Sequence, residues 1–354
     1  MAAEDRRASI FDAPSLDAVH RELRLDPEHV RRLRNAVMKK FVPDEAVRAS
    51  FPVVERLRMH ALTLHRRLDS KLDGATKLLF RTDRGLLTES VVLRIASGRS
   101  TVCVSSQVGC AAACRFCATG TMGIARSLST AEILDQVASA GQIVAAEGRR
   151  LRNVVFMGMG EPLHNEAALV ETLTALTHPA WFDLSARRVM VSTVGVIDGM
   201  VRLAERFPRV GMALSLHSAR QDTRQSLIPL AKKYPLPQLR EAVARLNAIQ
   251  SQPVMLEYVM LDGQTDTEDE RRALQEWSTG LDVHINLIPY NQVDGAPELR
   301  PTPMPDIRRF AEGLKAAGLT TTVRRSLGRD IEAACGQLVE RHNLARTAGR
   351  TATP

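Results

Sequence analysis

Short hydrophobic runs separated by segments of helical spacing constrain the fold of this chain most strongly. They predict strands at residues 101–104, 153–157, 188–191, 210–214, 254–261 and 283–288, with a further short strand at 320–323. A helix over residues 129–145 follows the first strand and begins with the capping-box pattern Ser129-Thr-Ala-Glu132. Strands that alternate with helices form a parallel sheet, because each helix carries the chain back to the same edge. The sequence therefore predicts an α/β fold, a partial (β/α) barrel of about six parallel strands.

Residues 1–95 have a different pattern. Residues 27–40 and 53–68 carry apolar side chains at helical spacing among Arg and Lys, which predicts helices. Residues 76–82 and 89–95 flank a turn at Asp83-Arg-Gly and predict a short antiparallel pair of strands. We therefore expect a small, mainly helical accessory domain over 1–95, an α/β core over 96–342 whose final helix holds Cys335, and a disordered tail over 343–354.

The positive charge of the chain is unevenly distributed. The net charge is +8, and residues 1–100 hold 20 Lys and Arg against 14 Asp and Glu, whereas the remaining 254 residues hold 28 against 26. An excess of this kind suggests a polyanionic partner, and the accessory domain is then the part that binds nucleic acid. A basic surface that only keeps the protein in solution fits the composition equally well.

The cellular compartment follows from the apolar runs and the cysteines. No apolar run reaches the roughly 20 residues that a membrane span needs, and no apolar segment follows the charged N-terminus. Four of the five cysteines fall within residues 103–117, which is a poor disulfide framework and a good metal or redox site. We expect a cytoplasmic protein without a membrane partner.

The cysteines Cys110, Cys114 and Cys117 form the pattern C-x3-C-x2-C. A structural zinc site needs four ligands, and Cys103 could serve as the fourth, although the second C-x2-C pair of a zinc ribbon is absent. Three thiolates that hold an iron–sulfur cluster leave one iron open to a small molecule. The spacing favours the iron–sulfur cluster over zinc.

Small and polar residues follow the predicted strands at their carboxyl ends, the edge that carries the active site of (β/α) barrels. They are the clustered cysteines, Gly160 and Glu161, Ser192, the run Ser215, Leu216 and His217, and Asn291. The sequence therefore predicts an active site at this edge. Taken alone, His217 could be an ordinary loop residue, and Cys335 could be a small buried hydrophobic residue.

Six motifs in the chain resemble one family. They are Cys103-Val-Ser-Ser-Gln-Val-Gly-Cys110, Phe156-Met-Gly-Met-Gly-Glu-Pro-Leu, Ser192-Thr-Val-Gly, Ser215-Leu-His, Asn286-Leu-Ile-Pro-Tyr-Asn291 and Ala333-Ala-Cys335-Gly-Gln-Leu. Together with C-x3-C-x2-C, they are similar to the RlmN/Cfr family of radical S-adenosylmethionine (SAM) RNA adenine methyltransferases. The resemblance covers roughly residues 70 to 340.

The resemblance implies two cofactors, a [4Fe-4S] cluster and SAM, and a reaction at carbon 2 or carbon 8 of adenine. These carbons are electron-poor and cannot attack the SAM methyl group as nucleophiles, so a radical route is required. In this family one SAM methylates a cysteine, and a second is cleaved reductively to a 5'-deoxyadenosyl radical that takes hydrogen from that methyl group. The carbon radical adds to adenine, a base removes the ring proton, and a second cysteine releases the product by forming a disulfide.

Each role has a counterpart in this sequence. The resemblance assigns Cys110, Cys114 and Cys117 to the cluster, Cys335 to the methyl group and Cys103 to product release. Glu89 matches the proton acceptor, and the segment from it to Cys103 is one residue longer than the family pattern. The SAM contacts implied are Gly160, Glu161, Ser192, Ser215, Leu216, His217 and Asn291.

The implied RNA partner is 23S rRNA, with tRNA as a further candidate. An electron donor such as a flavodoxin-type reductant is the second implied partner. We expect the protein to be a monomer. Two segments depart from the family pattern, Gly123-Ile-Ala-Arg-Ser-Leu and Ala231 in Pro229-Leu-Ala-Lys, and they leave the RNA target and the methylated carbon open. Two alternatives remain. They are another radical SAM reaction on RNA, and a metal-stabilised RNA-binding protein without catalysis, which would have no use for Cys335 or Glu89.

Overall fold

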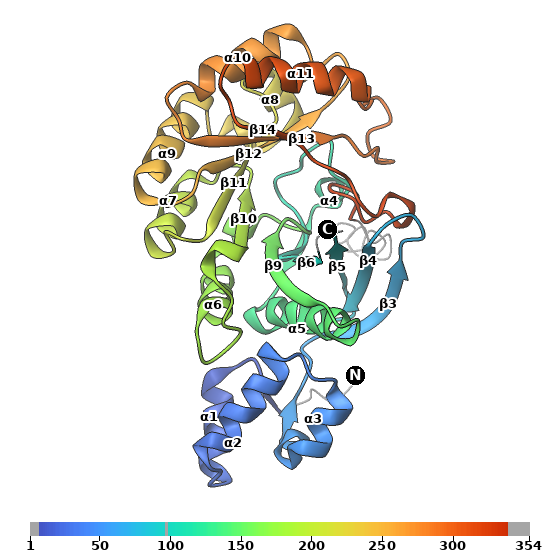
Figure 1. The fold of residues 1–354 in the computed structure, drawn as a ribbon, viewed down its shortest axis with the longest axis vertical. Coiled ribbons are helices and arrows are strands. Elements are labelled where there is room, and N and C mark those ends of the chain that lie inside the picture. The colour runs from blue at the N-terminus through green and yellow to red at the C-terminus, as the bar shows by residue number, and fades with distance from the viewer. Residues whose placement is uncertain (1–6, 96–97, 339–354) are drawn as a thin grey trace, which may run out of the picture.

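A ten-stranded sheet runs through the computed structural model, which describes residues 7–95 and 98–338 (Figure 1). The strand order is β14-β13-β12-β11-β10-β9-β6-β5-β4-β3. The strands from β14 to β6 are parallel, and β5 (Leu87–Arg94), β4 (Ala75–Arg81) and β3 (Thr63–Asp69) extend the sheet in antiparallel fashion. The parallel strands are β6 (Arg99–Cys103), β9 (Arg150–Phe156), β10 (Val189–Thr193), β11 (Gly211–Ser215), β12 (Val254–Met260), β13 (Val283–Pro289) and β14 (Thr321–Val323). The predicted α/β fold with a parallel sheet is confirmed.

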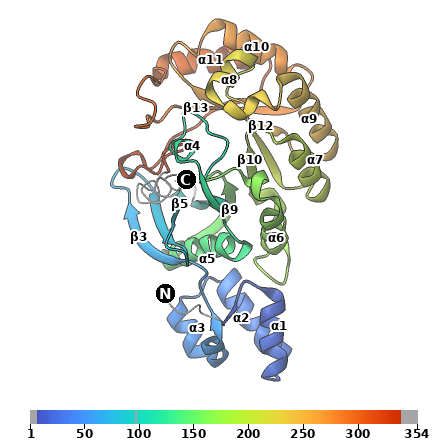
Figure 2. The same ribbon diagram turned by 180° about the vertical axis from the view of Figure 1, so that it is seen from behind.

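The helices that connect the parallel strands lie along the outer side of the curved sheet (Figures 1 and 2). They are α5 (Thr130–Ala146), α6 (Glu166–Thr177), α7 (Ile197–Arg206), α8 (Gln221–Leu227), α9 (Leu236–Ile249), α10 (Glu268–Ser278) and α11 (Met304–Ala316). The predicted capping box at the start of α5 is present, because Ser129 and Glu132 each accept the other's backbone N–H. The main hydrophobic core lies between this helical layer and the sheet, and two smaller apolar clusters contain residues around the cysteine loop and on the inner face.

The N-terminal part is helical up to residue 56. It consists of α1 (Ala13–Glu22), α2 (Pro27–Arg34), a π-helical turn (Asn35–Lys39), α3 (Asp44–Ser50) and a 3₁₀ helix (Pro52–Arg56), with the short parallel pair β1 (Ala8–Ser9) and β2 (Leu57–Arg58). Phe41 packs directly on α5, where a side chain at Gly141 would come within 2.2 Å of the Phe41 ring. The helical part therefore shares one hydrophobic core with the sheet.

His60 joins this helical part to the core. It donates from Nε2 to Asp44 of α3 at 2.6 Å and from Nδ1 to Asp135 of α5 at 2.7 Å. Burial lowers the pKa of His60, but the hydrogen bonds and charges of Asp135 and Asp44 outweigh burial and raise this pKa to about 10. A charged imidazolium therefore lies between two carboxylates at the junction.

The helix expected over residues 53–68 is wrong in its second half. Residues Thr63–Asp69 form β3, which pairs with β4 (Ala75–Arg81), and β4 pairs with β5 (Leu87–Arg94). Pairing with a neighbouring strand overrides helical spacing here, because strand formation depends strongly on the surrounding sheet. The boundary that we expected at residue 95 lies inside the ten-stranded sheet, and the change from helices to sheet occurs near residue 60.

The segment 324–338 is not the helix expected around Cys335. It contains one short 3₁₀ helix (Arg329–Ile331), and the positive φ angles of Gly328, Glu332 and Gly336 interrupt any longer helix. The segment runs back beside β3, β4 and β5 (Figures 1 and 2). The tail expected over 343–354 lies outside the described residues. Within residues 7–95 and 98–338, no helix is both long and apolar enough to cross a membrane.

Candidate active site

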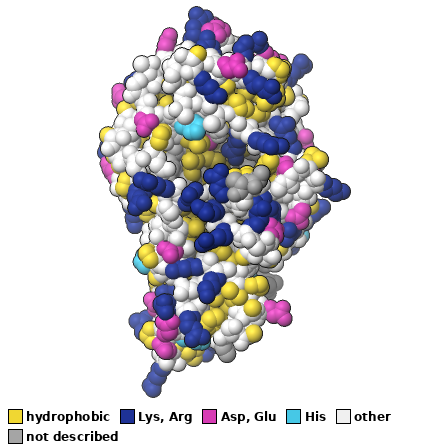
Figure 3. All heavy atoms as spheres, viewed as in Figure 1, with side chains coloured by type: hydrophobic (Ala, Val, Ile, Leu, Met, Phe, Trp, Pro, Cys, Tyr) yellow, Lys and Arg dark blue, Asp and Glu magenta, His cyan; other side chains and the backbone are white. Residues whose placement is uncertain are grey.

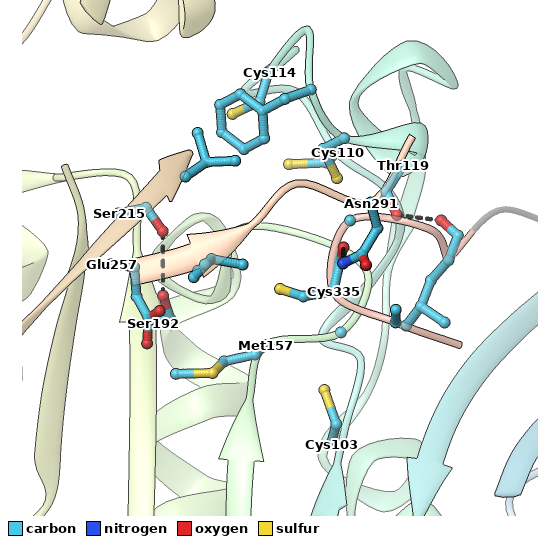
Figure 4. A pocket seen from close by; sticks show the side chains of 18 of the residues that line it. Cys103, Cys110, Cys114, Thr119, Met157, Ser192, Ser215, Glu257, Asn291 and Cys335 are labelled. Carbon is cyan, nitrogen blue, oxygen red and sulfur yellow. Dashed lines mark hydrogen bonds between the residues drawn. The ribbon is translucent and has the colours of Figure 1, made fainter. Parts of the chain in front are cut away.

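One cavity on the inner face of the sheet gathers most of the predicted site residues (Figure 4). They come from the carboxyl ends of β6, β9, β10, β11 and β13, from the cysteine loop and from the segment 324–338. The predicted residues that line it are Cys103, Cys110, Cys114, Cys117, Gly160, Glu161, Ser192, Ser215, His217, Asn291 and Cys335. Leu216 and Glu89 are the predicted residues that do not line it, and both are fully buried.

The three clustered cysteines lie on one loop at the edge of the cavity, and all are free thiols. Burial raises the pKa of Cys110 to about 12 and also raises the pKa of Cys114 and of Cys117. Backbone N–H groups of residues 112 and 113 donate to the Cys110 sulfur, and those of 119 and 120 donate to Cys117. These donors favour thiolates, the form in which cysteine binds iron.

The arrangement of the three cysteines on this loop suits an iron–sulfur cluster better than a single metal ion. Within the described ranges, no three His, Cys, Asp or Glu side chains lie close enough together to hold a single metal ion. The thiolates of an iron–sulfur cluster bind different iron atoms and therefore stand further apart than the ligands of one ion. Three thiols around one cavity, supported by backbone donors, fit a cluster held by Cys110, Cys114 and Cys117.

Gly160 and Glu161 form the turn after β9. Gly160 has a φ of +102°, and a Cβ atom there would lie 2.6 Å from the Gln107 Cβ, so only glycine fits. The Glu161 carboxylate accepts from the backbone N–H of Leu163 at 3.0 Å and from that of Val194 at 2.9 Å. Burial nevertheless raises the pKa of Glu161 to about 7. A cation that enters the cavity, such as an ammonium group, would therefore stabilise the ionised form.

Ser192 and Ser215 stand at the ends of neighbouring parallel strands, and their hydroxyl oxygens lie 3.3 Å apart (Figure 4). Asn291 lies across the cavity on the chain that follows β13. Its amide donates to the Cys335 carbonyl at 3.1 Å and accepts from Arg329 at 3.0 Å. Asn291 therefore holds the segment that carries Cys335.

His217 is buried beside the cysteine loop with a φ of +61°. Its ring lies edge-on against Phe116 of that loop, with ring centroids 4.5 Å apart. Burial, with a smaller effect of the Arg224 charge, lowers the pKa of His217 to about 3. The imidazole is therefore neutral at physiological pH and offers one N–H donor.

Arg224 is a site-forming residue that the sequence analysis missed. It is completely buried on α8 and donates to three carbonyl oxygens, those of Val194 (2.6 Å), Ser215 (3.1 Å) and Leu216 (2.8 Å). These carbonyls follow β10 and β11, so Arg224 fixes the two loops that carry predicted SAM contacts. Leu216 lies outside the cavity lining, and its carbonyl helps to hold its loop. No motif in the sequence marks Arg224.

Glu257 and Arg324 also line the cavity and were not predicted. Glu257 interrupts the apolar strand β12, and its carboxylate accepts from Asn286 at 2.8 Å. Burial raises the pKa of Glu257, and the Arg324 charge opposes this rise. A carboxylate within a buried strand is an unusual sequence feature that could have identified Glu257.

Cys103 and Cys335 line the same cavity as two further free thiols (Figure 4). Burial, with a smaller contribution from Cys335, raises the pKa of Cys103 to about 12. Burial also raises the pKa of Cys335, while the Arg324 guanidinium favours its thiolate. The fifteen-residue cysteine stretch therefore divides into three thiols on a loop and one at the end of a strand.

Glu89 lies on β5, next to the strand that ends in Cys103. The ladder pairs Val91 with Cys103, and Glu89 is two residues from Val91, so all three side chains share the inner face of the sheet. The ladder between β5 and β6 therefore fixes where Glu89 stands relative to Cys103.

Comparison with known proteins agrees with this geometry. A family model described as the radical SAM superfamily matches residues 104–274. A probable RNA methyltransferase of Rhodopirellula baltica is 54% identical over 346 residues, covering 98% of this chain and 91% of that protein. A probable dual-specificity RNA methyltransferase RlmN of Thermus thermophilus is 44% identical over 266 residues, covering 75% and 74%.

A relative with a longer match and a solved structure extend this agreement. Dual-specificity RNA methyltransferase RlmN 1 of Myxococcus xanthus is 36% identical and covers 94% of this chain and 95% of that protein. The crystal structure of a radical SAM methyltransferase from Sphaerobacter thermophilus matches with a TM-score of 0.85 and 36% identity, covering 93% and 98%. The chain belongs to the RlmN/Cfr-type family of radical SAM RNA methyltransferases.

Proposed function

We propose that this methyltransferase modifies carbon 2 or carbon 8 of an adenosine in RNA through a methylated Cys335. The observation that carries the proposal is the presence of two free thiols, Cys103 and Cys335, in the cavity that also holds the C-x3-C-x2-C thiols. A cluster that only stabilised a fold, or a protein that only bound RNA, would need neither of these additional thiols.

Four residues of the protein have separate roles in the proposed reaction. The bound [4Fe-4S] cluster and SAM would supply the methyl group and the radical chemistry. Cys335 carries the carbon that joins the adenine ring, and the Arg324 guanidinium favours the thiolate that accepts this carbon. Glu89 takes the proton from the ring carbon. The adduct must also lose one electron, which the bound cluster would take up. Cys103 then forms a disulfide with Cys335 as the bond between the carbon and the Cys335 sulfur breaks; the electron pair of that bond stays on the carbon, which takes up a proton to become the methyl group.

Glu161, His217 and Ser215 are the proposed polar contacts for SAM. The ionised Glu161 would accept from the SAM ammonium group, and the neutral His217 offers an N–H donor beside the cysteine loop. Gly160 lets the backbone approach the cofactor. Ser192 and Asn291, which also line the cavity, complete the proposed contact set. Leu216 lies behind the lining, and its expected contact with SAM is replaced by a role in holding its loop.

The RNA substrate in this proposal is 23S rRNA, with tRNA as a second substrate in accordance with the dual specificity named for the relatives. Lys and Arg side chains gather on the face that contains the hollow of the cavity and continue over the helical part (Figure 3). Such a surface attracts phosphates, and an adenine turned out of folded RNA would enter the cavity. We further propose a cytoplasmic monomer that receives electrons from a flavodoxin-type donor.

A cysteine series tests the two-cysteine reaction. Cys335→Ala should keep its iron and acid-labile sulfide and yield no methylated RNA, because the acceptor of the methyl group is gone. Cys103→Ala should accumulate protein covalently joined to RNA, since release requires the second thiol. Cys114→Ala is the matched control that loses the cluster. Methylated RNA from Cys335→Ala would contradict the proposal, as would stoichiometric zinc without sulfide in the wild type.

The methylated carbon requires a separate measurement. Nucleosides from 23S rRNA and tRNA of cells with and without the gene can be compared by mass spectrometry. We expect 2-methyladenosine or 8-methyladenosine to disappear with the gene. If neither RNA changes, the proposed substrate is wrong.

A further inference from the structure

Lys77 is a buried cation on the inner face of the sheet that none of the assigned roles uses. It lies on β4 and is 5% exposed, and its ammonium nitrogen is 3.7 Å from Glu89 Oε2. The same nitrogen donates to the carbonyl oxygen of Glu332 at 3.2 Å. Lysine is almost never buried unless it is paired, and Glu89 and the Glu332 carbonyl are the partners found here.

We propose that Lys77 is a positioning residue for proton transfer, which keeps the Glu89 carboxylate ionised and ties it to the segment that carries Cys335. The inference rests on the proposed function, because it requires Glu89 to accept the proton of the adenine ring carbon. In that step the carbon–hydrogen bond breaks, its electron pair stays on the ring, and the proton moves to a Glu89 oxygen. Lys77 neither gives nor receives the transferred proton.

The surroundings of Glu89 explain why a cation is needed. Glu89 is completely buried, and burial favours the neutral form of a carboxyl group, which cannot accept a proton. In the described part of the chain, the ionisable groups near this face include Lys77 on β4, Cys103 on β6, Glu257 on β12, and Arg324 and Cys335 on the segment 324–338. The Arg324 guanidinium interacts with Cys335, Glu257 and Cys103. Among the described residues, Lys77 lies in ion-pair range of Glu89.

The second bond of Lys77 connects the proton acceptor to the methyl carrier. Glu332 precedes Cys335 by three residues, and its side chain is exposed while its carbonyl faces Lys77. One ammonium group therefore fixes both the carboxylate and the backbone that carries the thiol. A proton acceptor must lie within hydrogen-bond reach of the proton that it removes, so this link sets the alignment of the two groups.

Other bonds hold the segment on the sheet when Lys77 is changed. Asp330 accepts from the Ser70 hydroxyl at 2.7 Å and from the Lys71 N–H at 2.9 Å, and Asp73 accepts from the Gly328 N–H at 2.8 Å. These three bonds join the segment to the connection between β3 and β4. The loss of the Lys77 charge can therefore be separated from a general loss of structure.

The test compares Lys77→Met, which keeps the length of the stem, with Lys77→Arg, which restores a cation. Lys71→Met is the matched control, because this side chain is exposed and its backbone bond to Asp330 remains. Methylated Cys335 and 5'-deoxyadenosine report the steps before proton transfer. Methylated RNA and covalent protein–RNA adduct report the steps after it.

For Lys77→Met we expect normal methylation of Cys335, a roughly 10- to 100-fold slower formation of methylated RNA at neutral pH, and accumulated adduct. The acid limb of the pH–rate profile should move to higher pH, because the carboxylate forms less readily without the cation. Lys77→Arg should return the rate of RNA methylation and the acid limb of the pH–rate profile towards the wild-type values. A Lys77→Met/Glu89→Gln double variant should be no slower than Glu89→Gln, since both changes act on one step.

Two results would overturn the inference. One is a wild-type rate and pH profile for Lys77→Met, and the other is a parallel loss of Cys335 methylation, which indicates a structural role. Failure of the proposed function itself would be visible in the wild type, which would then contain no methylated Cys335.

Discussion

His217 Nδ1 accepts a hydrogen bond of 3.0 Å from the backbone N–H of Val259. This bond fixes the neutral ring as the tautomer that carries its proton on Nε2. It also ties the loop after β11 to β12, in addition to the bonds from residues 216 and 217 to the Glu257 carbonyl. The sheet therefore sets this tautomer, which leaves the Nε2–H of His217 as its donor.

The His217 environment predicts a dependence of stability on acid. The folded pKa of about 3 lies below the ordinary value of 6.5, so the histidine contributes no slope above pH 6.5. As the pH falls from 6.5 towards 3, its contribution should fall by up to about 1.4 kcal/mol per pH unit. His217→Asn, which keeps an acceptor and tolerates positive φ, should lack this slope in urea unfolding between pH 4 and 8. An equal slope in both proteins would contradict the prediction.

His60→Ala should loosen the helical part, because Asp135 remains buried without the imidazolium. We expect a loss of about 3 kcal/mol in unfolding free energy at pH 6 and faster amide hydrogen exchange in α1 to α3. The folded pKa of His60 is raised, so its contribution is fully present below pH 6.5 and disappears as the pH rises through about 10. His65→Ala, on the exposed strand β3, is the control. If the difference in unfolding free energy between His60→Ala and the wild type stays constant from pH 6 to 10, His60 does not have this role.

Arg224→Met should weaken SAM binding and lower activity about 100-fold, because the loops after β10 and β11 lose their shared donor. Arg224→Lys should not restore activity, since an ammonium group cannot reproduce the planar donor geometry towards three carbonyls. Arg220→Met, at the exposed start of the same helix, is the matched control. Equilibrium dialysis with SAM measures the effect, and equal affinities for Arg224→Met and Arg220→Met would exclude it.

Gly160→Ala should abolish SAM binding, because the new Cβ would displace Gln107 or the turn after β9. Gly263→Ala is a suitable comparison, since Gly263 also has positive φ, at +67°, and no atom lies within 4 Å of its added Cβ. Backbone strain alone costs about 1–2 kcal/mol and should appear in both thermal unfolding curves. The loss of SAM affinity should appear in Gly160→Ala alone, and its appearance in both variants would mean that strain is the cause.

The strands of the parallel sheet were predictable because their burial on both faces leaves continuous apolar runs. Residues 254–261 and 283–288 were expected, and the strands are Val254–Met260 and Val283–Pro289. Since such strands point the same way, residues after their carboxyl ends meet at one edge, and the cavity gathers most of the expected site from there.

The remaining features depend on contacts between distant parts of the chain. Residues 63–69 have helical spacing but form a strand, since β4 offers a free edge. Arg224 lies in a short helix without any motif, and its role is defined only by carbonyls on two other loops. The motif around Cys335 identified a candidate reactive cysteine but did not predict the conformation of its segment. The positive φ angles of Gly328, Glu332 and Gly336 exclude the expected helix.

The docking of residues 328–338 on the connection between β3 and β4 and on α4 (Ala118–Thr121) has a consequence for biosynthesis. The Ala118 N–H donates to the Gly336 carbonyl at 2.7 Å, and the Thr119 hydroxyl donates to the Leu338 carbonyl. The end of the cysteine loop therefore depends on this segment for two hydrogen bonds. A growing chain can complete all of its parallel strands before these residues are made. The cavity then lacks one wall and Cys335, so a chain released before this point would have every parallel strand but no complete active site.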